Sequence, residues 1–159
     1  MNTADVLKYG HLTLLKTLDG LPESDWTTPG VCGIWSVKDI MAHLASYEHV
    51  LIDVLNTFLN DGPTPYLTQY VEHGLPFNDH QVALRRDHSA QQTLAEYKEA
   101  HEQVMALVLR LPAERIAQVG TLLWYGPEYA LDDFIVYSFY GHKREHSAQV
   151  AVFRDQIKR

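Results

Sequence analysis

The sequence has only one cysteine, Cys32, among its 159 residues, which excludes a disulfide bond within the chain. Long hydrophobic runs are also lacking, because His, Glu, Asp or Asn interrupts each apolar stretch before it reaches the length of a membrane span. The N-terminal residues do not combine a basic stretch with an unbroken apolar one, which predicts no signal peptide. We therefore expect a cytoplasmic protein with no membrane partner.

Basic side chains are few, with 13 Lys and Arg against 20 Asp and Glu, and the formal net charge is -7. Binding to a phosphate backbone needs clustered positive charge, so we expect no nucleic-acid partner. The chain also lacks a Gly-rich phosphate loop, a GxSxG elbow and an HExxH motif. What it has is a hydrophobic content of 46% and a length suited to one compact domain, which we place over residues 1–159.

Apolar residues recur at helical spacing, and no segment has the alternation of a strand. Ser36 and Asp39 form a capping-box pattern at the start of the second helix, and Ser89 is a good N-cap at which the third helix could divide. We expect a one-turn helix over 113–116 and a long irregular loop over 61–77. The prediction is an all-α, antiparallel four-helix bundle with long connecting loops. Its helices would span about 2–19, 36–60, 78–111 and 131–156.

Three of the nine histidines have the placement of metal ligands. His142 and His146 are four residues apart on a predicted helix, so both imidazoles lie on one face, together with Phe139. His43 occupies the inward register of the second helix, where it could complete a three-histidine site. Two alternatives remain: a solvated histidine pair on a polar helix face, and a core His43 hydrogen-bonded to a hydroxyl. The hydroxyl candidates are Tyr140 and Ser138.

The remaining histidines are weaker candidates. His49 points elsewhere on its helix, and His11 and His101 lie on apolar stripes that are typical of hydrogen-bonded core histidines. His73 and His80 are in or near the long loop, where they could line the mouth of a site. No cysteine or carboxylate is placed to act as a fourth protein ligand.

Three segments, taken in order, resemble the DinB-like superfamily of metal-binding bundles. They are WSVKDIMAHL at 35–44, the Phe77–Asn78 pair and GHKREHSAQ at 141–149. This superfamily includes YfiT-type thiol transferases and mycothiol-dependent isomerases. The resemblance implies an antiparallel four-helix bundle, usually a homodimer, with a metal ion held by His43, His142 and His146. Some relatives, the ClbS-like colibactin-resistance proteins, share the bundle and are thought to act without this metal.

The expected chemistry follows from three neutral imidazoles that leave a divalent ion (Zn, Ni or Fe) with an open position. A low-molecular-weight thiol bound there would lose its proton and attack a small electrophile held under the 61–77 loop. Gln149 and Tyr140 are the candidates to orient substrate or water. The same site could instead ionise water and hydrolyse an amide or ester.

A competing hypothesis is a non-catalytic protein that binds and detoxifies a small molecule. Its cavity would be lined mainly by aromatic residues, namely Trp26, Trp35, Trp124, Tyr47 and Phe139.

Overall fold

All regular secondary structure in the part of the chain that the structure describes is helical. The structure is a computed structural model that describes residues 1–60 and 62–158. Within these residues the only β-type pairing is an isolated bridge between Cys32 and Trp35. The prediction of an all-α protein is therefore confirmed. None of the described helices is both long enough and apolar enough to cross a membrane.

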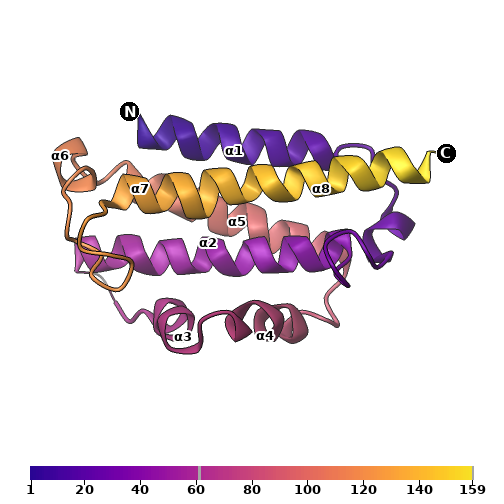
Figure 1. The fold of residues 1–159 in the computed structure, drawn as a ribbon, viewed down its shortest axis with the longest axis horizontal. Helices are drawn as coiled ribbons and strands as arrows, with labels where there is room; N and C mark the ends of the chain where they lie inside the picture. The colour runs from indigo at the N-terminus through magenta and orange to yellow at the C-terminus, as the bar shows by residue number, and fades with distance from the viewer. Residues whose placement is uncertain (61, 159) are drawn as a thin grey trace.

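Four long helical segments lie beside one another along the long axis of the molecule (Figure 1). They are α1 (Thr3–Leu18), α2 (Val37–Leu59), α5 (Ala90–Val108) and a composite of α7 (Leu131–Ile135), η2 (Val136–Gly141) and α8 (His142–Ile157). Short helices connect them: η1 (Glu23–Thr27), α3 (Pro65–His73), α4 (Pro76–Leu84) and α6 (Ala113–Ile116). The segments expected over 2–19, 36–60 and 113–116 are thus found with nearly the expected boundaries.

Local capping explains why two of these helices begin where they do. The Ser36 hydroxyl accepts the backbone N–H of Asp39, whose carboxylate accepts the backbone N–H of Ser36, as the capping-box pattern predicts. Ser89 and Gln92 make the same reciprocal pair at the start of α5. Both caps satisfy backbone donors that have no partner inside the helix.

The expectation of an irregular loop over 61–77 was wrong, because α3 and α4 occupy most of this segment. Each helix begins with a proline, Pro65 or Pro76, at a position where the missing N–H costs nothing. The backbone N–H groups of Tyr66 and Leu67 donate to the carboxylate of Asp53 on α2, at 2.7 and 3.1 Å. This cap comes from a distant part of the sequence, which local patterns do not reveal. The third predicted helix, 78–111, is accordingly two helices, α4 and α5.

Neighbouring helices do not simply alternate in direction, which corrects the expectation of an antiparallel arrangement. Lys38, near the start of α2, donates to the backbone of Arg86 just before α5, and Arg115 just after α5 stacks on Phe58 near the end of α2. Therefore α2 and α5 run in parallel. The α3–α4 connection makes this possible by returning the chain along the length of α2 (Figure 1). By contrast, α2 and α8 are antiparallel, as the contacts of the site below show.

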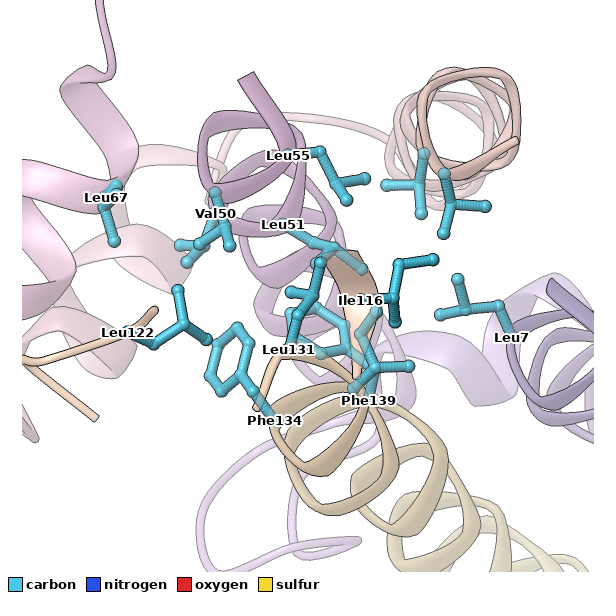
Figure 2. Packing of buried hydrophobic residues seen from close by; sticks show 14 of the residues in the cluster. Leu7, Val50, Leu51, Leu55, Leu67, Ile116, Leu122, Leu131, Phe134 and Phe139 are labelled. Carbon is cyan, nitrogen blue, oxygen red and sulfur yellow. The ribbon is translucent and has the colours of Figure 1, made fainter. Parts of the chain in front are cut away.

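The apolar core has two parts, one toward each end of the long helices. One part contains Leu51 of α2 and Phe139 of η2, and Leu67 of α3 and Leu122 also join it (Figure 2). The other contains Met41 of α2 and residues near the ends of α1 and α8. Between these parts every long helix contributes polar side chains, and we call this region the polar layer. The layer consists of His11, His43, Ser46, Glu48, His101, His142, Lys143, His146 and Ser147.

Candidate metal centre

Three imidazoles from two helices converge in the polar layer. The Nε2 atom of His142 lies 2.9 Å from Nε2 of His43 and 2.9 Å from Nε2 of His146. The ligand atoms of all three lie within 4.8 Å of one another. His43 and His146 are 2% and 5% exposed, whereas His142 is half-buried. The structure therefore brings together the three histidines that the sequence predicts, and it does so on the inward face of α8.

The helix that carries two of these histidines changes its geometry immediately before the first. Residues 136–141 form η2, a π-helix, and His142 is the first residue of α8. His142 also forms a hydrogen bond with the backbone of Ser138, one turn earlier. Single π-turns inside α-helices occur often at functional sites, since they re-aim side chains. The sequence pattern predicts the helix here but gives no signal for the π-turn.

Burial keeps the three imidazoles neutral. Desolvation, followed by the neighbouring histidines, lowers the pKa of His43 to about 2. Desolvation, together with the neighbouring His146, lowers the pKa of His142 to about 3. Desolvation also lowers the pKa of His146, although its hydrogen bond to Gln149 opposes this shift. Because a metal ion binds imidazole only in its neutral form, the three side chains are in the state required of ligands near neutral pH.

The hydrogen bonds of two of the rings leave their Nε2 lone pairs facing each other. Nδ1 of His146 donates to Oε1 of Gln149 at 2.8 Å, because an amide oxygen can only accept. Because Nε2 of His142 faces the other histidines, its Nδ1 is the atom that donates to the backbone oxygen of Ser138. Two unprotonated nitrogens 2.9 Å apart repel each other unless a cation lies between them. The residues present therefore fit a divalent metal ion.

Aromatic side chains surround the histidine cluster. The ring of Tyr47 lies 4.6 Å from that of His43 and 4.8 Å from that of His142, and Trp35 lies 4.9 Å from His43. The Tyr47 hydroxyl donates to Oδ1 of Asn78 at 3.1 Å. Burial, and to a lesser degree Tyr70, raises the pKa of Tyr47 to about 12, so its hydroxyl keeps its proton. In the sequence, the only indication of Tyr47 is its position one turn after His43.

Two cavities adjoin one another at this cluster, and we name them by their walls. The histidine cavity, of about 260 Å³, is lined by Tyr47, Tyr70, Tyr137, Ser138, Gly141, His142 and Glu145. The aromatic cavity, of about 330 Å³, is lined by Tyr47, Tyr70, Val71, Gly74, Leu75, Asn78, Trp124 and Tyr125. Tyr47 and Tyr70 belong to both. Larger cavities of about 430 and 570 Å³ occur elsewhere, but none of the three histidines lines them.

The two residues proposed to orient substrate or water have different surroundings. Gln149 contacts the site through its hydrogen bond to His146. Tyr140 is not brought to the histidines: it packs against Gly10 of α1, and its hydroxyl accepts a hydrogen bond from Arg144 at 3.3 Å. Tyr140 lies two residues before His142, and this spacing places it on a different face of the helix.

The other histidines mostly have the roles expected of them. His11 is hydrogen-bonded to Tyr97, and Nδ1 of His101 lies 3.2 Å from a carboxylate oxygen of Glu48, so both are core histidines with polar partners. His49 points away from the site and bonds to a carboxylate on α5. His73 and His80, expected near the mouth of the site, line neither cavity. Of the aromatic residues expected to line a binding cavity, only Trp124 and Tyr47 line either of these two cavities.

Fold and site together define an all-helical protein with two buried histidines and one half-buried histidine that could together hold a metal ion. The sequence profile of the mycothiol maleylpyruvate isomerase N-terminal domain family matches residues 10–131, which is more than half of the chain. The chain belongs to this family, whose domain is of the DinB-like superfamily, and the superfamily resemblance is confirmed. The match includes His43 and ends before His142 and His146. No curated protein matches the chain, and no solved structure does either.

Proposed function

We propose that this protein is a divalent-metal-dependent enzyme on a DinB-like four-helix bundle, and that it transfers a low-molecular-weight thiol to small electrophilic molecules. The observation that carries the proposal is the convergence of three imidazoles, in which Nε2 of His142 lies 2.9 Å from Nε2 of His43 and 2.9 Å from Nε2 of His146. Zn, Ni and Fe all suit three imidazole ligands. A divalent ion bound there supplies Lewis acidity, which lowers the pKa of a thiol or water ligand.

The protein's own residues would hold, orient and shield the reacting groups. His43, His142 and His146 would hold the ion, and Gln149 fixes the tautomer and ring orientation of His146. Since His142 also lines the histidine cavity, a small molecule in that cavity would reach the ion. The hydroxyl of Tyr47, whose proton is donated to Asn78, belongs to a side chain that lines both cavities, and its oxygen could accept a hydrogen bond from a bound substrate.

The thiol part of the proposal rests on the family. The mycothiol maleylpyruvate isomerases that name it depend on a thiol, and the matched region includes His43. Metal-assisted hydrolysis is the alternative at the same site. Turnover of an electrophilic substrate by the metal-loaded protein should require an added thiol if the enzyme is a transferase. Turnover at the same rate with and without added thiol would favour hydrolysis.

Elemental analysis of protein purified without a His tag tests the metal site directly. We expect about one divalent ion per chain in the wild type and a large loss in His43→Ala and His146→Ala. His88→Ala, an exposed histidine outside the site, is the matched control and should keep its metal. Full metal occupancy in His43→Ala would contradict the proposal.

A second candidate function is non-catalytic binding of a small molecule for detoxification, and the aromatic cavity supports it. In that case His142→Ala should remove bound metal and leave the affinity for the small molecule unchanged. If the protein is an enzyme, the same substitution abolishes turnover. The homodimer expected from the resemblance stays a prediction, which sedimentation equilibrium would test.

A further inference from the structure

We propose that the aromatic cavity binds the part of the substrate remote from the metal, and that this part is an uncharged, planar or aromatic group. The inference rests on the proposed function, in which the reacting end of the substrate occupies the histidine cavity. It adds the chemical class of the remaining part. We infer this class from three features of the aromatic cavity: it adjoins the histidine cavity, its walls are apolar or neutral, and its rim is exposed.

The two cavities adjoin one another and share two wall residues. Tyr47 and Tyr70 line both, and the ring of Tyr47 contacts that of His142 at 4.8 Å. One molecule could therefore reach from the histidines to Trp124. The aromatic cavity alone, at about 330 Å³, falls within the usual range of about 300–1,000 Å³ for small-molecule sites.

The walls of the aromatic cavity are apolar or neutral. Among the described residues that line it, four are aromatic, two are aliphatic, and none is Lys, Arg, Asp or Glu. The rings meet at steep angles, with Tyr47 on Tyr70 at 81° and Tyr70 on Trp124 at 86°. With this edge-to-face arrangement, a planar ligand could contact both the faces and the edges of the aromatic rings. Asn78 is the only amide side chain in the lining, and it already accepts the hydroxyl of Tyr47.

Charge in the surroundings disfavours an ionic group in the aromatic cavity. A carboxylate would have no cationic partner among the lining residues, and Glu145, which lines the adjoining histidine cavity, would repel it. A cationic group would be repelled by a divalent ion at the histidines. An uncharged group meets neither penalty. It would also cover Leu75 and Val71, which are 84% and 47% exposed at the rim.

A substitution at Leu75 can test the preference for an uncharged group without destabilising the fold. It precedes α4, it lines the aromatic cavity, and it is 84% exposed, so Leu75→Arg places a cation at the rim without disturbing the core. Leu84→Arg is the matched control, because Leu84 is 59% exposed at the other end of α4 and lines neither cavity. Both variants should show the wild-type helical content and unfolding midpoint.

Equilibrium dialysis with three probes of the same shape then measures the preference: 4-nitrobenzyl alcohol, 4-nitrobenzoate and 4-nitrobenzylamine. With EDTA present, we expect the wild type to bind the alcohol at least about tenfold more tightly than either ion, since an unpaired charge would have to be desolvated. Leu75→Arg should strengthen binding of the benzoate relative to the alcohol several-fold, and Leu84→Arg should not. The same ratios measured on zinc-loaded protein extend the test to the metal-bound state.

Equal or tighter binding of an ion by the wild type would overturn the inference. An equal effect of both arginine variants would overturn it as well, since binding would then not involve the cavity. Failure of the proposed function has a different signature, namely absence of metal from the purified protein while the alcohol still binds with the expected preference. The two failures are therefore distinguishable.

Discussion

Lys143 of α8 and Glu48 of α2 form an ion pair in the polar layer, with Nζ 2.5 Å from Oε1 and with 2% and 0% of their side chains exposed. Removing one partner would leave an uncompensated buried charge. We therefore predict that Glu48→Gln lowers the free energy of unfolding by about 3–5 kcal/mol, as for other broken buried pairs. Urea denaturation followed by circular dichroism measures the change.

The double variant Glu48→Met/Lys143→Met serves as the control, because it removes both charges at similar volume. It should recover most of the stability that Glu48→Gln loses. If the double variant is as unstable as the single one, the cost comes from packing rather than from the unpaired charge.

The same pair should make stability depend on pH in the acid range. Burial raises the pKa of Glu48, but Lys143 and His101 outweigh burial and hold it at about 2, below the ordinary value of 4.5. A group whose pKa is lower in the folded protein stabilises it above pH 4.5 and loses this contribution as the pH falls toward 2. In EDTA, the wild type should lose more stability than Glu48→Met/Lys143→Met between pH 5 and 3. Parallel curves for the two proteins would contradict the ionised state of Glu48.

Gln149 should affect metal affinity without being a ligand. Gln149→Leu removes the acceptor that holds Nδ1 of His146, so the ring loses its fixed tautomer and orientation. We expect zinc affinity to fall by about 10–100-fold, as for other residues that orient ligands. Competition with a chromogenic chelator measures this. Gln156→Leu, an exposed position near the end of α8, is the matched control and should bind zinc as the wild type does.

Tyr140 should be dispensable for the site. Among the described residues, Arg144 alone donates to its hydroxyl, in an exposed hydrogen bond, so Tyr140→Phe should change the free energy of unfolding by less than about 0.5 kcal/mol and leave the metal content unchanged. Tyr47→Phe is the informative comparison, because it removes the hydroxyl of a half-buried side chain that lines both cavities. A loss of activity in Tyr140→Phe as large as that in Tyr47→Phe would restore Tyr140 as a candidate.

The sequence was sufficient for those features that depend on short-range spacing. Helical periodicity and the Ser36 and Ser89 caps predict the long helices, and the four-residue spacing of His142 and His146 places both on one face. His43 was predictable because apolar neighbours fix the inward register of α2. These features are encoded within one or two turns of helix, so one sequence reveals them.

Features that depend on contacts between distant segments could not be predicted in this way. Tyr140 packs against Gly10 of α1, a contact between distant segments that the sequence does not reveal. Helix α3 was missed because its start also depends on a distant segment. The prolines and glycines around it resemble loop composition, and the cap that begins α3 is Asp53, which belongs to α2.

The cap supplied by Asp53 should control the local stability of α3, and hence of the aromatic cavity that Tyr70 and Val71 of α3 line. Asp53 is 6% exposed, and Asp53→Ala would leave the N–H groups of Tyr66 and Leu67 without their acceptor, at a cost of about 1–2 kcal/mol. We expect amide hydrogen exchange over Pro65–His73 to accelerate several-fold, while exchange in α5 stays unchanged, because α3 can open without the long helices. Asp87→Ala, an exposed position between α4 and α5, should alter neither. Uniformly faster exchange in Asp53→Ala would mean that Asp53 stabilises the whole molecule and that α3 does not move as a separate wall of the cavity.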